Sequence, residues 1–241
     1  MLFHPSGGLI YHGRALRWQR TLWRPFHAAV AQWLAQWLQQ WQGTSQHKAE
    51  QLVLVGPSGG YALNADFLAH FARLTVLEPD GLARRILQHK FPACRFEMAD
   101  EVTDSPTFKL AQPDGFDHLA QYYPKAAFLF CNLFGQQLMG SAPAHFERQR
   151  WLIGLVPAMQ GRIWASWHDL ASTTRPPDVM GVCQYAHSEA LADVLAHYWH
   201  GGELEIYDHE CSGICPALPR QTAIWQLTAK RYHLIEWLHS A

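Results

Sequence analysis

The most informative stretch of the chain runs from Gln51 to Tyr61 and reads QLVLVGPSGGY. An apolar run of β type breaks there into a glycine-rich turn, and Glu78 follows at the end of a second apolar run. In nucleotide-type cofactor sites, a buried strand leads into a loop whose backbone N–H groups approach the ligand. A carboxylate at the end of the next strand accepts hydrogen bonds from a ribose. The stretch therefore predicts a cofactor loop and its ribose-binding acid.

Composition sets the broad class of protein. The chain has 241 residues, of which 49% are hydrophobic and 16% charged, with a formal net charge of −1. These values are typical of a folded globular protein and exclude a general polyanion-binding protein. Neither a leader pattern nor a membrane-spanning apolar run is recognisable, and the five cysteines are scattered. We therefore expect a cytoplasmic protein with reduced thiols and no membrane association.

Apolar β-type runs alternate with segments of helical period. This pattern predicts a mostly parallel, seven-stranded Rossmann-like sheet with helices on both faces and an antiparallel C-terminal strand. Strands are expected at 52–55, 74–78, 95–98, 127–131 and 161–167, and helices at 64–72, 81–89, 116–122, 144–159 and 188–199. Residues 203–209 and 222–228 are expected to form an antiparallel pair at the sheet edge, and 232–237 a further strand or short helix.

Residues 1–45 form an extension that this α/β domain, residues 46–241, does not require. Phe26, Val30, Trp33, Trp37 and Trp41 recur at helical spacing, opposite a polar face rich in glutamine. We expect this apolar stripe to pack on the α/β domain as a cap. The alternatives are a homodimer through the same helix or contact with a membrane, and the lack of basic residues on the polar face disfavours the second.

The order of elements and the motifs resemble the class I S-adenosylmethionine-dependent methyltransferases over residues 46–237. Gly56, Ser58 and Gly60 occupy the alternate positions of that family's first glycine motif. Ser58 replaces the middle glycine, and Leu54 stands where the family usually has an acid. The chain is thus identified as a divergent member.

The resemblance implies a function and a set of site residues. S-adenosylmethionine is the implied cofactor, and its methyl group would pass to an acceptor that the sequence does not identify. Asp100 resembles the acid that pairs with the adenine amino group, and Asn132 falls where the family places residues that face cofactor and substrate. The implied cofactor-binding residues are Gly56, Pro57, Ser58, Gly59, Gly60, Glu78, Pro79, Asp100 and Asn132.

Catalytic candidates are expected at the carboxyl ends of strands, where open parallel sheets bind ligands. His168 ends the fifth predicted strand and Asn132 follows the fourth. We expect His168 to deprotonate the acceptor near neutral pH and Asn132 to orient it.

Two other functions compete with this interpretation. Leu54 and Ser58 depart from the family pattern, which suggests a noncatalytic binding or scaffold protein with the same fold. The spacing of Gly56, Ser58 and Gly60 also fits the nucleophile elbow of a serine hydrolase. The acid and histidine that such a hydrolase needs can be nominated as Asp208 with His233 or Asp169 with His209.

A metal site and a nucleic-acid site are the remaining candidates. His209, Cys211 and Cys215 lie within seven residues, but a fourth ligand for structural zinc is missing locally, so no metal site is predicted. Nucleic acid would bind, if anywhere, along a basic stripe near the N-terminus that we expect to be a solvated helix face. The stripe consists of Arg14, Arg17, Arg20 and Arg24.

Overall fold

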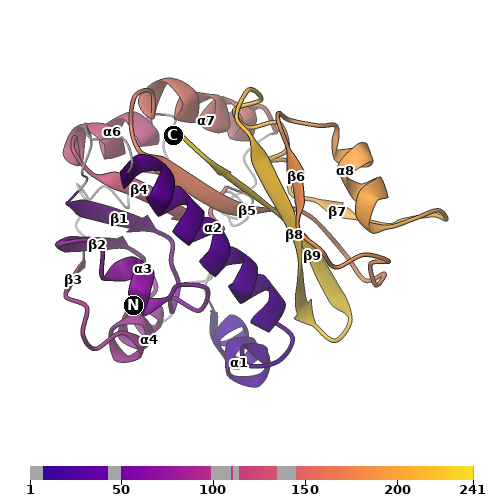
Figure 1. Ribbon diagram of the computed structural model, residues 1–241, viewed down its shortest axis with the longest axis horizontal. Coiled ribbons are helices and arrows are strands. Elements are labelled where there is room, and N and C mark those ends of the chain that lie inside the picture. Colours follow the sequence, from indigo (N-terminus) through magenta and orange to yellow (C-terminus); the bar gives the residue numbers. More distant parts are fainter. Residues whose placement is uncertain (1–7, 43–49, 99–109, 111–113, 135–144, 241) are drawn as a thin grey trace.

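The computed structural model describes residues 8–42, 50–98, 110, 114–134 and 145–240. Its first five strands are parallel and lie side by side in the order β3-β2-β1-β4-β5 (Figure 1). They are β1 (Gln51–Val55), β2 (Arg73–Leu77), β3 (Phe96–Met98), β4 (Ala127–Cys131) and β5 (Trp164–Thr173). The central strands are buried on both faces, which explains their continuous apolar sequences.

The sheet continues beyond β5 through antiparallel strands. β9 (Arg231–His239) pairs with β5, β8 (Arg220–Thr228) pairs with β9, and β6 (Cys183–Tyr185) forms the edge. β7 (Tyr207–Asp208) makes a short antiparallel pair with the far end of β5. The expected mostly parallel sheet with an antiparallel C-terminal part is confirmed, but the described sheet has nine strands rather than seven.

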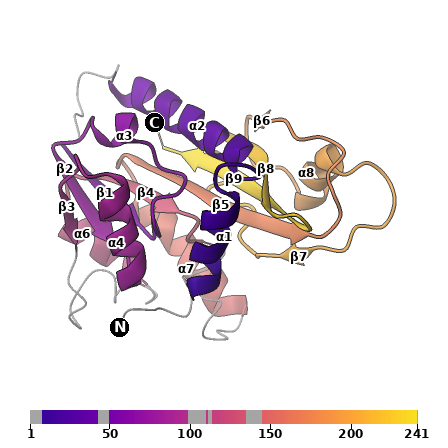
Figure 2. The same cartoon turned by 90° about the horizontal axis from the view of Figure 1, so that it is seen from below.

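Helices cover both faces of this sheet (Figures 1 and 2). One face packs against α1 (Gly8–Trp18), α2 (Arg24–Gln42), α3 (Ala65–Leu68) and α4 (Gly81–Lys90). The other packs against α6 (Gly115–Tyr122), α7 (His145–Ala158) and α8 (Leu191–Tyr198). Alternate residues of β1 enter the two cores, with Leu52 and Leu54 on the first face and Val53 and Val55 on the second.

Two expectations about strands are wrong. The antiparallel pair is the hairpin β8–β9, whose strands are joined by a short turn, and residues 203–206 lie outside any strand. β5 also extends beyond residue 167, to Thr173, because β9 pairs along its whole length. The polar composition of residues 168–173 hid this extension.

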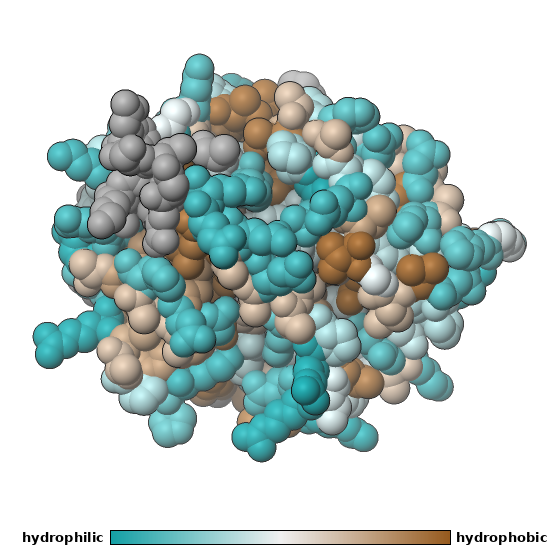
Figure 3. Space-filling view, viewed as in Figure 1, coloured by the Kyte–Doolittle hydropathy of each residue, from teal (hydrophilic) through white to brown (hydrophobic). Residues whose placement is uncertain are grey.

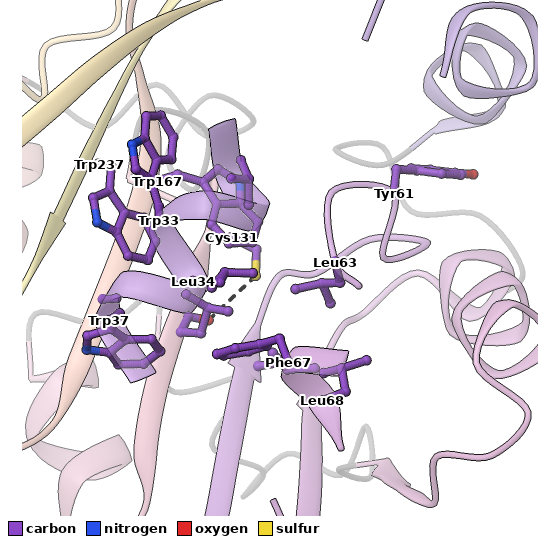
Figure 4. Packing of buried hydrophobic residues seen from close by; sticks show 14 of the residues in the cluster. Trp33, Leu34, Trp37, Tyr61, Leu63, Phe67, Leu68, Cys131, Trp167 and Trp237 are labelled. Carbon is purple, nitrogen blue, oxygen red and sulfur yellow. Dashed lines mark hydrogen bonds between the residues drawn. The ribbon is translucent and has the colours of Figure 1, made fainter. Parts of the chain in front are cut away.

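The tryptophans of α2 lie inside the first core. Trp33 and Trp37 are fully buried, and the Trp33 ring stacks on Trp237 of β9 with centroids 5.7 Å apart (Figure 4). The Trp33 indole N–H donates to Oε1 of Gln221 on β8 at 2.7 Å. The surface over α2 is largely hydrophilic (Figure 3). Trp33 and Trp37 are thus covered by the sheet. Homodimerisation through this helix stays a prediction.

The basic stripe does not form on a single helix. α1 ends at Trp18 and α2 begins at Arg24, so Arg20 lies in the turn between them. None of the described helices combines the length and apolar character needed to cross a bilayer.

Candidate functional site

The glycine-rich loop after β1 contains three residues with a left-handed backbone conformation. Gly56, Ser58 and Gly60 have φ values of 66°, 50° and 66°. The Gly56 N–H donates to the Leu77 carbonyl at 2.9 Å, which ties the loop to the end of β2. Glycine adopts such φ angles readily, whereas serine does so at a cost, so Ser58 is a strained position.

Two glycines of the loop are required by packing on α4. A Cβ atom at Gly59 would lie 2.8 Å from Cγ2 of Ile86, and one at Gly60 would overlap the side chain of Leu87. Substitution of either residue would therefore force neighbouring side chains to shift, and at Gly60 it would also strain the left-handed backbone. Leu54 is fully buried in the first core, so it does not present a polar group where the family usually has an acid.

Glu78 follows β2, and its side chain binds the backbone of the glycine loop. Its Oε2 accepts a hydrogen bond from the Ser58 N–H at 2.8 Å, and its Oε1 accepts one from the Asp80 N–H at 3.0 Å. Burial raises the pKa of Glu78 to about 7, against the lowering effect of these two hydrogen bonds and of Arg84. A carboxylate oxygen accepts more than one hydrogen bond, so Glu78 retains acceptor capacity for ligand hydroxyls.

Helix α1 is fastened to this loop by a buried histidine. Nδ1 of His12 lies 2.7 Å from the Tyr61 hydroxyl, and Nε2 lies 3.3 Å from Oδ2 of Asp80. Asp80 also caps α4, since its Oδ1 accepts hydrogen bonds from two backbone N–H groups of the first turn. Tyr11 precedes His12 in α1. Burial raises the pKa of Tyr11, and the charges of Tyr61, Asp169 and Glu78 raise it further. The end of α1 thus covers the carboxyl edge of the sheet.

Asn132 and Asp169 form the next part of this edge. Asn132 follows β4 with a positive φ of 54°, and its N–H donates to the Trp167 carbonyl at 2.7 Å. Its side-chain amide donates to Oδ2 of Asp169 at 3.1 Å, and its Oδ1 accepts the Asp169 N–H at 2.9 Å. This reciprocal pair fixes the orientation of the Asp169 carboxylate.

Two histidines complete a buried cluster around Asp169, which we call the Asp–His–His triad. Nδ1 of His233 on β9 lies 3.1 Å from Oδ1 of Asp169. His209, which follows β7, offers a ring nitrogen within 4.8 Å of the ligand atoms of the other two. Burial alone would raise the pKa of Asp169, but His233, His209 and the Asn132 hydrogen bond together lower it below its usual range. The lowered pKa favours the charged form of the Asp169 carboxylate.

His168 does not lie where the sequence suggested. It is fully buried on the opposite face of β5 from Asp169, with its ring against Phe134. Its Nε2 lies 3.4 Å from Oε2 of Glu236, and Glu236 accepts two hydrogen bonds from Arg220. The extended β5 places His168 within the strand rather than at its end. The expected position of His168 at the rim of the sheet is therefore wrong, whereas a catalytic role for this residue stays a prediction.

The serine hydrolase arrangement does not assemble around Ser58. The Ser58 Oγ is buried and has no hydrogen-bond partner within the described part of the chain. Of the nominated partners, Asp169 meets both His209 and His233, whereas Asp208 is exposed and caps the Glu210 N–H. The left-handed backbone of Ser58 resembles an elbow, but no described histidine activates the hydroxyl.

The remaining candidates of the sequence analysis are Asp100 and the cluster of His209, Cys211 and Cys215, at which no metal site was predicted. Asp100 lies outside the described residues. His209, Cys211 and Cys215 do not form a cluster of metal ligands among the described residues, and the Cys211 thiol donates to the backbone carbonyl of Asp169.

Sequence reasoning missed His12 and the Asp–His–His triad as a unit. His12 lies in the N-terminal extension and carries no motif. The sequence places Asp169, His209 and His233 only in alternative hydrolase pairs and, for His209, beside Cys211 and Cys215. Their spacing along the chain contains no metal-type motif that would have joined them.

Four segments of the chain contribute residues in order along the carboxyl edge of the sheet, three of them loops and one the strand β5. Glu78 follows β2, Gly56 follows β1, Asn132 follows β4, and Asp169 lies in β5, in the spatial order of these strands. The strand order reverses between β1 and β4, and ligands of open α/β sheets bind at such a switch point. The edge thus combines a backbone loop, two acids and an amide at the expected position of a ligand site.

No family model and no curated protein matches the chain. Among solved structures, magnesium protoporphyrin IX methyltransferase from Synechocystis PCC 6803, with SAH bound, is 14% identical, with 90% of this chain and 84% of that chain covered and a TM-score of 0.40. The N-methyltransferase NodS from Bradyrhizobium japonicum WM9 is 12% identical, with coverages of 90% and 95% and a TM-score of 0.41. The amino pentose methyltransferase CalS10 from Micromonospora echinaspora is 12% identical, with coverages of 97% and 83% and a TM-score of 0.39.

Likeness at this level carries no argument about activity or substrate. The fold assignment rests on the sheet itself, in which five parallel strands with a reversal between β1 and β4 are followed by the antiparallel β9 beside β5. This strand order confirms the expected Rossmann-like α/β fold with an antiparallel C-terminal part.

Proposed function

We propose that this protein binds S-adenosylmethionine at the glycine loop and Glu78 and transfers its methyl group to an acceptor held near Asn132 and Asp169. The single observation that carries the proposal is the buried Glu78 carboxylate, which accepts the Ser58 N–H at 2.8 Å at the switch point of the sheet. That arrangement supports recognition of a ribose by an acid placed beside a backbone loop.

Each part of the edge has a role in this proposal. Glu78 accepts hydrogen bonds from the ribose hydroxyls, and Gly56 keeps the floor of the loop free of side chain. The sulfonium supplies a good leaving group, so the protein has mainly to hold the acceptor in line with the methyl carbon. Asn132, oriented by its two hydrogen bonds with Asp169, is suited to position that acceptor.

A second candidate function is a binding protein without catalysis. The observation that favours it is the fastening of α1, because His12 contacts both Tyr61 and Asp80 beside the same loop. Residues 1–45 would then act as a closed cap over the site. Leu54, buried and apolar, supports this alternative because it removes a polar contact at the methionine end of the cofactor.

Calorimetric titration with S-adenosylmethionine and S-adenosylhomocysteine tests the first step. We expect micromolar binding to the wild type and at least a tenfold weaker affinity for Glu78→Gln, which keeps the shape of the side chain but removes its charge. Glu203→Gln is the matched control, because Glu203 is an exposed glutamate remote from the loop. Absence of binding at millimolar ligand would refute both candidates as cofactor-binding proteins.

Methyl transfer separates the two candidates once binding is established. Protein incubated with methyl-labelled S-adenosylmethionine and a small-molecule extract is expected to label a product and release S-adenosylhomocysteine. Binding without release of S-adenosylhomocysteine from any such mixture would favour the noncatalytic candidate.

A further inference from the structure

Three backbone arrangements bring the Asp–His–His triad together. The register of β5 against β9 shifts between Asp169 and Ala171, so that Leu170 is an extra residue in β5. Such a bulge turns neighbouring side chains and frees a carbonyl group. The Leu170 carbonyl accepts the His209 N–H at 3.0 Å, which places the residue after β7 beside Asp169. His233 comes from β9, opposite Ser172, on the far side of the same bulge.

All three side chains lie inside the protein. Asp169 is 1% exposed, His209 5% and His233 9%. Burial of an anionic carboxylate is costly unless positive groups or hydrogen bonds compensate for it. Two imidazoles converging on one buried carboxylate form a compact set of nitrogen and oxygen donors.

We propose that Asp169, His209 and His233 bind a divalent transition-metal ion. Their ligand atoms lie within 4.8 Å of one another, and the Asp169 Oδ1 to His233 Nδ1 distance is 3.1 Å. Donor atoms bound to one ion by bonds of about 2.0–2.2 Å lie roughly 3–3.5 Å apart, so only small side-chain movements are needed.

The donor set selects the class of ion. Imidazole nitrogen favours Zn²⁺, Fe²⁺, Co²⁺ and similar ions, whereas Mg²⁺ and Ca²⁺ prefer sites made wholly of oxygen. Two histidines and one carboxylate leave further coordination positions for water or a substrate atom. The chemistry therefore points to a site of the catalytic rather than the closed structural type.

A second shell already supports the carboxylate. The Asn132 amide donates to Oδ2 of Asp169, which leaves Oδ1 directed at His233. Outer hydrogen bonds of this kind orient metal ligands and raise affinity. Among the described residues, ligand atoms converge at the triad and not at the alternative cluster of His209, Cys211 and Cys215.

The experiment uses full-length protein, stripped with a chelator, kept reduced and titrated with ZnCl₂ by calorimetry. We expect one Zn²⁺ per chain, with affinity reduced more than 100-fold in His233→Gln and in Asp169→Asn. His89→Gln and Cys215→Ser are matched controls, because His89 is exposed on α4 and Cys215 belongs to the alternative cluster. Circular dichroism verifies that each variant is folded.

Three results would overturn the proposal. They are absence of Zn²⁺ binding to the wild type, full binding by folded triad variants, and loss of binding in Cys215→Ser. If both triad variants fail to fold, the absorption spectrum of Co²⁺ bound to the wild type tests which side chains are the ligands. We expect visible d–d bands without thiolate-to-cobalt charge transfer, and a strong near-ultraviolet thiolate band would contradict the assignment. MgCl₂ at the same concentration is expected to give no heat.

This inference does not depend on methyl transfer, because Zn²⁺ and Co²⁺ are measured in the absence of S-adenosylmethionine. A protein that binds the metal but not the cofactor would leave the triad site intact and refute only the proposed function. The reverse outcome would leave the cofactor site intact and refute only the metal site.

Discussion

Asn132 and Asp169 hold each other through two hydrogen bonds at the carboxyl edge of the sheet, from the Asn132 amide to the Asp169 carboxylate and from the Asp169 N–H to Asn132 Oδ1. Asn132 achieves this with a left-handed backbone, φ 54°. Asparagine tolerates that conformation better than most residues, and its side chain is short enough to reach the neighbouring strand. The pair therefore joins the proposed acceptor position to the proposed metal site.

Asn132→Gly tests this pair without adding backbone strain, because glycine also adopts positive φ. We expect the free energy of unfolding to fall by about 2–3 kcal/mol, since one of the lost hydrogen bonds has a charged acceptor. Zn²⁺ affinity is expected to fall about 10–100-fold as the carboxylate loses its orientation. Urea denaturation and calorimetry measure the two effects, and an unchanged Zn²⁺ affinity would separate Asn132 from the site.

Glu78 is expected to make stability depend on pH. Its pKa of about 7 in the folded protein lies above its ordinary value of 4.5, so the folded state binds more protons than the unfolded state between these values. The contribution of Glu78 to stability is therefore full below pH 4.5 and is lost as pH rises to about 7. The loss is on the order of 3 kcal/mol. Urea denaturation from pH 4.5 to 8 should show it in the wild type and not in Glu78→Gln.

Cofactor affinity should change with pH in the opposite sense. Ribose hydroxyls donate stronger hydrogen bonds to a charged carboxylate than to the neutral acid, so binding of S-adenosylhomocysteine is expected to tighten from pH 6 to pH 8. The Glu203→Gln control should retain this dependence. A flat profile in the wild type would show that Glu78 is ionised throughout or does not contact the ligand.

His12 is expected to hold α1 on the glycine loop. His12→Ala removes the contacts with Tyr61 and Asp80, which stabilise the docked helix by about 1–3 kcal/mol. Amide hydrogen exchange in α1 should therefore become faster, while exchange in β4 and β5 stays unchanged. His89→Ala serves as the control. Equal exchange in α1 of the two variants would show that aromatic packing, rather than His12, fastens the helix.

Trp33 is expected to be a major source of stability for the N-terminal segment. Trp33→Ala removes a fully buried ring that stacks on Trp237, so a loss of about 3–5 kcal/mol is expected. Trp33→Phe keeps most of the apolar surface and removes the hydrogen bond to Gln221, so its cost should be smaller. Gln39→Ala, on the exposed side of α2, should change stability by less than about 0.5 kcal/mol.

Ser58 is expected to resist an activity-based fluorophosphonate probe. Its Oγ is buried, and no described histidine contacts it, so nothing in the described part of the chain activates the hydroxyl. Intact-mass spectrometry of native protein should show no adduct, and Ser58→Ala should leave the spectrum unchanged. Stoichiometric labelling of Ser58 would revive the hydrolase interpretation.

The local sequence predicted the elements that depend on neighbours along the chain. The apolar run before Gly56 and the acid at Glu78 predicted β1, the loop and the end of β2, because strand periodicity and turn chemistry are local properties. The helical spacing of Trp33 and Trp37 likewise predicted an apolar face that is buried in the structure. These features gave the fold class and one half of the candidate site.

Tertiary structure alone decided which side chains make up the other half of the candidate site. Successive residues of a strand point to opposite faces, so the pairing of β5 with β9 places the buried side chains of His168 and Asp169 on opposite faces of the sheet. The bulge at Leu170 then brings His209 and His233 to the same carboxylate from separate segments of the chain. Residues so far apart in sequence carry no common periodicity, and only the register of the assembled sheet makes them neighbours.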